Sequence, residues 1–157
     1  MTGAAEELAL LDSGVIKISQ LQEQTVGVFF VWKSDGVTLR LILDTRAING
    51  HFHEPEYCQL PTPAAWQGLR TPAGGTLNLA QVDVEKAFYR IDAPPGLERS
   101  LCLPRVSADH LRQLRPGMSL PVGRYLTPQL VVLAMGWSWS LFFCQKIVGR
   151  SYWCCVC

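Results

Sequence analysis

Residues 26–44 read Val-Gly-Val-Phe-Phe-Val-Trp-Lys-Ser-Asp-Gly-Val-Thr-Leu-Arg-Leu-Ile-Leu-Asp and contain two strand-like runs on either side of a turn. The first run is rich in β-branched and aromatic side chains, which favour strands. A Ser-Asp-Gly turn signal follows it, and the second run, residues 38–44, alternates in character. The stretch therefore predicts a β-hairpin. In its second strand the three leucines share one face, so Arg40 and Asp44 project together from the other.

A second informative stretch comes after a connector. Residues 53–75 carry several prolines and a Gly-Gly pair, which is typical of a loop-rich segment, with a short helix predicted near Ala64–Leu69. Thr76–Val82 has strand character and ends at Asp83. Residues 85–90 have helical composition, and the Pro-Pro-Gly sequence beyond them predicts the end of that helix.

The remaining residues add strands and one long helix. Residues 1–20 carry no motif and are expected to be weakly ordered or helical. Residues 99–106 and 122–125 are candidate strands with a loop-rich insertion between them, and residues 130–133 predict a further strand. Gly136 interrupts the apolar pattern, and Ser138 is a candidate N-cap for a helix that runs to about Gly149. This order of elements predicts an α+β fold.

Composition limits the class of protein. The chain has 157 residues, of which 48% are hydrophobic and 17% charged, and its formal net charge is +1. This length suggests one domain with a substantial core, and the apolar fraction excludes disorder over most of the chain. The near-zero charge excludes a nucleic-acid binder that works by bulk positive charge, but it leaves room for a local basic groove.

Targeting and cysteine signals point to an intracellular protein, with nuclear and cytoplasmic locations left open. Acidic residues near the N-terminus argue against a secretory signal, and a disulfide framework is therefore not expected. The spacing of the six cysteines does not require a zinc site. The apolar run Leu130–Cys144 is shorter than the roughly 20 residues of a membrane span, so no membrane partner is expected.

Four motifs occur in one order along the chain: Lys33-Ser-Asp-Gly, Arg40-Leu-Ile-Leu-Asp-Thr-Arg-Ala-Ile-Asn49, Asp83-Val-Glu-Lys-Ala-Phe-Tyr-Arg-Ile91 and Leu133-Ala-Met-Gly-Trp-Ser-Trp-Ser140. No single motif is specific, but together they resemble the fingers and palm of reverse transcriptases, which are RNA-directed DNA polymerases of retroelements. The resemblance implies an antiparallel palm sheet with helices on one face. It divides the chain into an N-terminal segment (1–25), a fingers-like hairpin and connector (26–75), a partial palm (76–150) and a Cys-rich tail (151–157).

The resemblance matches Lys33 and Arg40 to the cations that hold the triphosphate of an incoming deoxynucleoside triphosphate. A flexible ammonium and a planar guanidinium both suit phosphate oxygens. A solvated surface charge is the alternative interpretation of each. Asp44, Arg46 and Asn49 match the family's fingers motif, and we expect a structural role for them, with Asp44 either orienting Arg40 or pairing with Arg46.

Asp83 matches the first catalytic aspartate of the family. Phosphoryl transfer needs in-line positioning and charge neutralisation by metal ions, usually two Mg²⁺ ions about 4 Å apart. Because Mg²⁺ prefers oxygen ligands, the Asp83 carboxylate and the Val84 backbone carbonyl are its candidate ligands, with Glu85 a weaker alternative. A strand-terminal or helix-capping aspartate is the structural alternative.

Three more residues match positions around the nucleotide. Phe88 matches the residue that excludes a ribose 2′-hydroxyl, although a core phenylalanine is an equally simple interpretation. Gly136 matches the point where the backbone approaches the nascent base pair, and Met135 matches a side chain that lies against the nucleotide. Ala134 departs from the proline that is usual there, so the turn is expected to be less rigid. The two tryptophans of the motif are expected to pack.

The stretch between positions 99 and 124 has five arginines but only one acidic residue, Asp109. It is a candidate contact for the backbone of an RNA template and DNA primer, and an ordinary solvated loop is the alternative. Gln145 is a weaker candidate for contact with the template strand. The candidate nucleic-acid-binding residues are thus Arg99, Arg105, Arg112, Arg115, Arg124 and Gln145.

The family's second catalytic motif, a hairpin with two adjacent aspartates, is missing. No Asp or Glu follows Asp109, and the last residues do not fit the family pattern. We therefore expect a reverse-transcriptase fragment that is inactive by itself. A nucleic-acid-binding module without chemistry and a non-functional truncated remnant are the alternatives, and the oligomeric state stays open.

Overall fold

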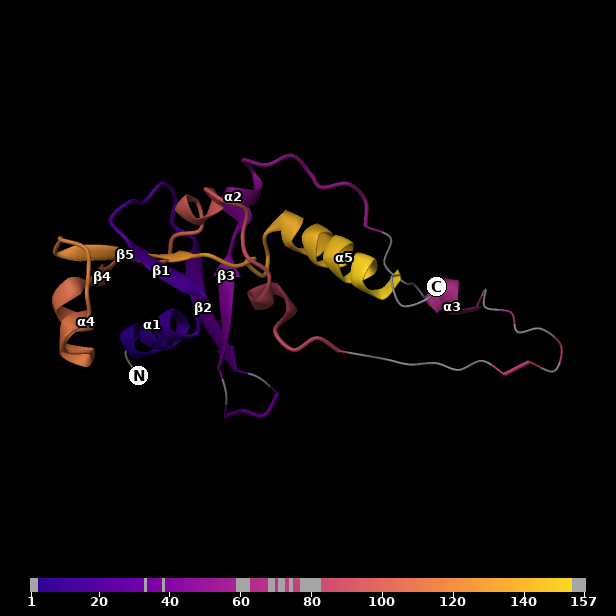
Figure 1. Ribbon diagram of the computed structural model, residues 1–157, viewed down its shortest axis with the longest axis horizontal. Helices are drawn as coiled ribbons and strands as arrows, with labels where there is room; N and C mark the ends of the chain where they lie inside the picture. Colours follow the sequence, from indigo (N-terminus) through magenta and orange to yellow (C-terminus); the bar gives the residue numbers. More distant parts are fainter. Residues whose placement is uncertain are drawn as a thin grey trace.

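The computed structural model describes residues 3–32, 34–37, 39–58, 63–67, 70, 73, 75–76 and 83–153. They form an α+β fold with two small antiparallel sheets, as predicted (Figure 1). The helices are α1 (Gly3–Asp12), α2 (Arg46–Asn49), α3 (Pro63–Gln67), α4 (Ala108–Leu114) and α5 (Ser138–Trp153), with two 3-10 helices, η1 (Ala87–Arg90) and η2 (Leu97–Arg99).

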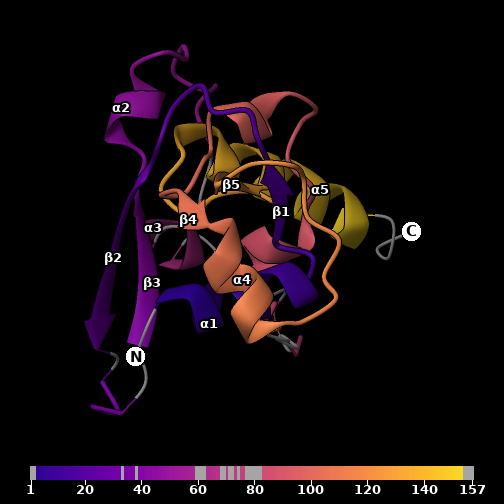
Figure 2. The same ribbon diagram turned by 90° about the vertical axis from the view of Figure 1, so that its left-hand side faces the viewer.

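The predicted β-hairpin is confirmed. Strand β2 (Gly27–Trp32) pairs antiparallel with β3 (Leu39–Asp44), and Gly27 lies opposite Asp44. Gly36 in the turn has a φ of +63°, a conformation that glycine adopts readily. Large side chains of β2, including Phe29 and Trp32, are exposed. Figure 2 shows the two strands side by side along one side of the molecule.

The second sheet combines distant parts of the sequence. Its order is β1 (Ile16–Ser19), β5 (Tyr125–Leu130) and β4 (Val106–Ser107), with both pairs antiparallel. The helix expected within residues 1–20 is present as α1, but β1 was not predicted. Its four residues are too short for their alternation to be a clear strand signal. The N-terminal segment therefore belongs to the same sheet as the predicted palm residues.

Four other predicted elements differ in the structure. Within residues 99–106 only Val106 is in a named strand, and the expected loop that follows contains α4. The strand expected at residues 122–125 begins at Tyr125 and ends at Leu130, where the next strand was expected to begin. The helix expected at residues 85–90 is the 3-10 helix η1. The strand predicted at 76–82 lies almost wholly outside the described residues, as does the Cys-Cys-Val-Cys end of the tail.

The core surrounds β5. Every residue from Leu126 to Leu130 is buried, which is typical of a central strand covered on both faces. The larger buried cluster joins residues of β1, β3, α2 and η2 to the segment that leads into α5. A smaller cluster lies between α1, α4 and the sheet. Figures 1 and 2 both show α1 beside α4.

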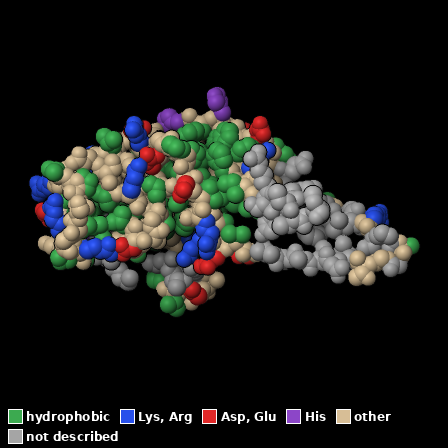
Figure 3. Space-filling model, in the orientation of Figure 1, with side chains coloured by type: hydrophobic (Ala, Val, Ile, Leu, Met, Phe, Trp, Pro, Cys, Tyr) green, Lys and Arg blue, Asp and Glu red, His purple; other side chains and the backbone are tan. Residues whose placement is uncertain are grey.

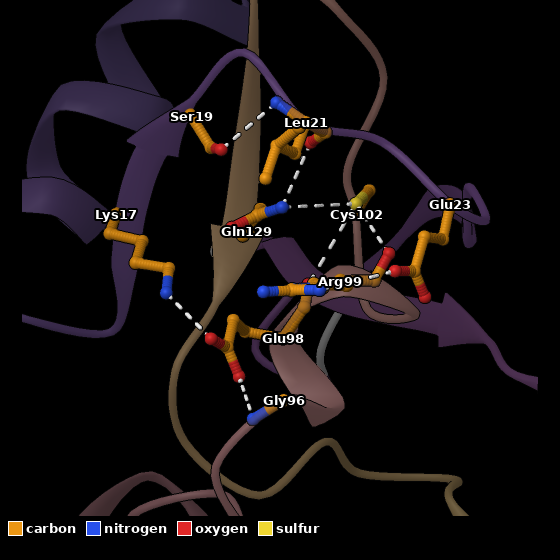
Figure 4. A network of polar contacts seen from close by, with 9 residues as sticks. All are labelled: Lys17, Ser19, Leu21, Glu23, Gly96, Glu98, Arg99, Cys102 and Gln129. Carbon is orange, nitrogen blue, oxygen red and sulfur yellow. Dashed lines mark hydrogen bonds and ion pairs between the residues drawn. The ribbon is translucent and has the colours of Figure 1, made fainter.

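Polar contacts connect η2 to the sheet (Figure 4). Lys17 of β1 donates to Glu98 at 2.8 Å, and Glu98 also accepts from the backbone N–H of Gly96 at 2.7 Å. Buried Gln129 of β5 donates to the carbonyl of Leu21 at 2.9 Å, so its amide nitrogen is not left unsatisfied. The Lys17 contact lowers the pKa of the Glu98 carboxyl. These bonds connect η2 to β1, and Leu21 to β5.

Within the described residues, no helix has both the length and the apolar character needed to cross a bilayer.

Candidate functional site

Hydrogen bonds from Asn49 connect α2, which follows the hairpin, to the turn at Gly136. Asn49, the last residue of α2, donates from Nδ2 to the carbonyl oxygen of Gly136 at 3.0 Å. Its Oδ1 accepts from the backbone N–H of Ser138 at 3.0 Å. The predicted helix is present, but Ser138 is its first residue and not its N-cap, and it ends at Trp153 instead of near Gly149. The side chain that satisfies the amide of Ser138 is Asn49. One side chain thus fixes both the turn and the start of α5.

Gly136 lies against the backbone that leaves β3. A Cβ atom at this position would be 3.0 Å from Oγ1 of buried Thr45 and 3.3 Å from the carbonyl oxygen of Leu43. The φ of Gly136 is +105°, which other residues rarely adopt. Both observations explain why glycine occupies this turn. The contact with Thr45 was missed by the sequence reasoning, because nothing in a single Thr signals a long-range contact.

Asn49→Ala is expected to lower the free energy of unfolding by about 1–2 kcal/mol, because it removes a helix cap and a tertiary hydrogen bond. Asn49→Asp keeps the acceptor for Ser138 but places a carboxylate oxygen opposite the carbonyl oxygen of Gly136, so this variant should also be less stable than wild type. Urea unfolding of the three proteins measures the difference. Equal stability of wild type and Asn49→Ala would show that the two hydrogen bonds contribute nothing.

Asp44 pairs with Arg46, which settles the alternatives considered for this carboxylate. Arg46 donates from Nε to Asp44 Oδ1 at 2.8 Å and from Nη2 to Oδ2 at 2.6 Å, and its backbone N–H donates to Oδ1 at 3.2 Å. The side-chain hydrogen bonds and then the backbone one lower the pKa of Asp44 from 3.8 to about 2. The pair fixes the chain at the junction of β3 and α2.

The Asp44 contact predicts acid sensitivity. Because the pKa of Asp44 is lower in the folded protein than in the unfolded chain, its contribution to stability is complete above pH 4. That contribution is lost as pH falls from about 4 towards 2. Asp44→Asn should therefore lose less stability than wild type over this window. The melting temperature of each protein, followed by circular dichroism at several pH values between about 4 and 2, measures this loss. An equal fall of the melting temperature in the two proteins would contradict the prediction.

The Asp83 segment reaches the core through the residues that follow it. Asp83 and Val84 are exposed, and Asp83 has no hydrogen-bond or ion-pair partner among the described residues. The Glu85 carboxylate is 3.7 Å from Nζ of Lys86, and the Glu85 carbonyl accepts from Arg90 Nε at 2.8 Å. Lys86 has a φ of +55°, so the chain turns sharply before η1. Asp83 therefore lies just before a turn that the Arg90 hydrogen bond connects to η1.

Phe88 and Tyr89 anchor this turn. Both side chains are partly buried and pack against the main core cluster, and burial raises the pKa of Tyr89. Phe88 thus packs against the core, in line with its interpretation as a packing residue, but it is only partly buried. Its sugar-selecting role stays a prediction, and the two are compatible because a packed ring is a rigid one.

The segment after η1 runs antiparallel to the segment before Gly136. Asp92 forms an isolated bridge with Val132, Leu133 N–H donates to Ile91 O at 2.9 Å, and Ala93 N–H donates to Val131 O at 2.8 Å. In an antiparallel pair, the residues before Ile91 and those after Leu133 lie at the same end of the paired segments. Phe88 and Gly136 are therefore both found at that end. Met135 beside Gly136 is 48% exposed, as a nucleotide contact requires.

The hairpin contributes one described cation. Arg40 is the second residue of β3, lies opposite Val31 and is exposed. Lys33 lies outside the described residues. The hairpin end with Asp44 is joined to Gly136 through Thr45 and Asn49, so three of the four motifs are connected by contacts or by the bridge.

No family model and no curated protein matches this chain. The assignment of a function therefore rests on the motifs and on the geometry described above.

The described residues provide few ligands for a metal ion. They contain no group of three or more His, Cys, Asp or Glu side chains that could hold one. The Asp83 carboxylate has no partner among the described residues and is adjacent in sequence to the Val84 carbonyl, whereas the Glu85 carboxylate lies 3.7 Å from Lys86 Nζ. A protein site for Mg²⁺ can consist of one or two carboxylates completed by phosphates of the substrate. Asp83 fits that arrangement for a single ion, but the described residues do not form a two-metal centre.

Acidic residues from elsewhere in the chain reduce the charge of the predicted basic stretch. Arg115 pairs with Asp12 of α1, Arg112 with Asp109, and Arg99 lies 3.8 Å from Glu23. Arg124 stacks over the ring of Tyr125 with 5.6 Å to its centroid. Arg105 is exposed, and Gln145 lies within α5. Two of these acids are distant in sequence, which is why the stretch seemed more basic than it is.

Proposed function

We propose that this chain is a reverse-transcriptase-like unit that binds a deoxynucleoside triphosphate together with Mg²⁺. The observation that carries the proposal is the contact of Asn49 and Thr45 with the Gly136 turn. It joins the fingers-like motif to the palm-like motif that is expected to face the nucleotide. An arbitrary set of weak motifs would not be expected to meet in this way.

Each residue has a distinct role in the proposed site. Arg40, with Lys33, binds triphosphate oxygens from the hairpin, because a guanidinium donates to phosphate in a fixed fork. Asp83 and the carbonyl of Val84 would hold Mg²⁺, whose contribution is to neutralise phosphate charge. Phe88 limits the space beneath the sugar, and Gly136 allows the backbone to approach the base. An RNA template and a DNA primer are the proposed macromolecular partners.

Nucleotide binding and catalysis are separate expectations. Two-metal phosphoryl transfer needs carboxylates on both ions. The sequence has no Asp or Glu after Asp109, and Asp109 pairs with Arg112 in α4. We therefore expect this chain by itself to bind the nucleotide without extending a primer. Mg²⁺-dependent extension of a primer on an RNA template that disappears in Asp83→Asn would contradict this expectation.

Sugar selection tests the proposed function. Wild type should bind dTTP about tenfold more tightly than 5-methyluridine triphosphate, the corresponding ribonucleotide with a 2′-hydroxyl. This preference corresponds to roughly 1.4 kcal/mol. Phe88→Val should reduce this preference, because the smaller side chain leaves room for the hydroxyl. Calorimetric titration in MgCl₂ measures the affinity of each protein for both nucleotides. The control is Phe142→Val, which removes a phenylalanine ring on α5, and it should keep the preference. Equal affinity of wild type for both sugars would refute the role of Phe88, and no binding of either would refute the function.

A further inference from the structure

Strand β2 has one edge that no other described segment covers. The hairpin sheet contains only β2 and β3, so alternate N–H and C=O groups of β2 point away from β3. No backbone hydrogen bond from another described segment reaches residues 27–32. In Figure 2, β2 forms the outer side of the hairpin. An edge of this kind can accept a further strand, because its backbone groups are available for pairing.

The side chains of β2 are apolar and largely exposed. Phe29, Phe30, Val31 and Trp32 are each between 40% and 65% exposed. They occupy both faces of the strand, because successive side chains alternate. The protruding end of the hairpin also carries hydrophobic side chains at its surface (Figure 3). Soluble proteins commonly protect such an edge with charged residues or proline, and β2 has neither.

The other described strands of this chain fit the β2 edge poorly. Strand β3 carries Arg40 and Asp44, and its Leu43 carbonyl lies against the Gly136 turn. Strand β1 has Lys17 among its four residues, β4 has only two residues, and β5 is already paired on both sides. The strand that matches β2 is therefore β2 of a second copy, since two uncharged strands bring no like charges together.

We propose that two copies of this chain pair antiparallel through their β2 edges and form one sheet in the order β3-β2-β2-β3. A two-fold axis perpendicular to the sheet at Phe30 places this ring opposite Phe30 of the second copy, and Trp32 opposite Val28. Aromatic and β-branched side chains are favourable partners across antiparallel strands. Each copy uses its β2 edge once, so the assembly closes as a dimer. The proposal does not rest on the nucleotide site, to which the hairpin contributes Arg40 of β3.

The association should depend on protein concentration. A strand of six residues gives a small interface, so we expect a weak and reversible dimer. Sedimentation velocity of the full chain over about a hundredfold range of concentration should show the mass rise from one copy to two. A chain that stays monomeric over this range, or that grows beyond the dimer, would overturn the proposal.

Charges introduced at Phe30 test the β2 pairing itself. Phe30→Lys and Phe30→Glu should each stay monomeric, because pairing would place two like charges opposite each other. An equimolar mixture of the two variants should dimerise, since lysine then faces glutamate. Val122→Lys is the control: Val122 is 88% exposed in the segment before β5, and this variant should dimerise like wild type. Dimers of Phe30→Lys alone, or none in the mixture, would contradict the proposal.

Amide hydrogen exchange tests the pairing in wild-type protein. The N–H groups of residues 28–32 that point away from β3 become hydrogen-bonded in the dimer, so their exchange should slow as the concentration rises. The amides of α4, which packs on the other sheet, should exchange at an unchanged rate. Slowing that is confined to segments other than β2 would show that the copies associate elsewhere, and the proposal would then be wrong.

Discussion

Gly136→Ala should lower the free energy of unfolding by about 2–4 kcal/mol, near the upper end of single-residue effects. Two causes add. The backbone has a φ of +105°, which strains any residue with a Cβ atom. The added methyl would also meet Thr45 Oγ1 at 3.0 Å and the Leu43 carbonyl oxygen at 3.3 Å. The backbone oxygen cannot move without displacing β3, so the hairpin end and the turn would separate. Urea unfolding followed by tryptophan fluorescence measures the loss.

Gly149→Ala is the matched control for Gly136→Ala. Gly149 lies inside α5, and a Cβ there would meet nothing within 4 Å. Alanine is a better helix former than glycine, so this variant should gain about 0.5–1 kcal/mol. The same substitution is thus expected to act in opposite directions at the two sites. A Gly136→Ala variant as stable as wild type would show that the close approach to Thr45 and Leu43 is not a real constraint.

Asp83→Asn should reduce the affinity for dTTP in MgCl₂ by at least about tenfold, which corresponds to roughly 1.4 kcal/mol. Asp83 is exposed, and the substitution removes a candidate Mg²⁺ ligand without breaking a contact to any described residue. In EDTA the wild type and the variant should bind equally weakly, because the carboxylate then has no cation to hold.

Asp92→Asn is the control for charge alone. Asp92 is also exposed, and it lies beyond η1 in the backbone bridge to Val132. Its substitution should leave Mg²⁺-dependent binding unchanged. If Asp83→Asn and Asp92→Asn both retain wild-type affinity, Asp83 does not hold the metal ion.

The sequence predicted the elements that depend on residues close together in the chain. The hairpin has β-branched and aromatic residues on both sides of a Gly-containing turn, and these signals act within a few residues. The break at Gly136 likewise located the start of α5 to within one residue. By contrast, β1 forms because Ile16–Ser19 can pair with β5 more than 100 residues later. That pairing has no local signal, and neither has the burial of Gln129, which is satisfied by Leu21 across the chain.

The candidate site shows the same division. The motifs identified Asn49 and Gly136 separately, but only the structure shows that the amide of one holds the carbonyl of the other. The basic stretch was overestimated because Asp12 and Glu23, which pair with Arg115 and Arg99, lie far from it in sequence. Trp137 was expected to pack and does, and only the structure reveals that its buried indole nitrogen has no acceptor among the described residues.

We propose that the hairpin, the Asp83 turn and the Gly136 turn form one nucleotide site. Titration of the ¹⁵N-labelled chain with dTTP in MgCl₂, followed by backbone amide shifts, tests this proposal. We expect saturable shifts that share one dissociation constant at Arg40, at residues 84–88 and at Met135 and Gly136, with no change in α4. Shifts confined to α4 and its arginines, or no saturable shifts in the three motifs, would contradict it.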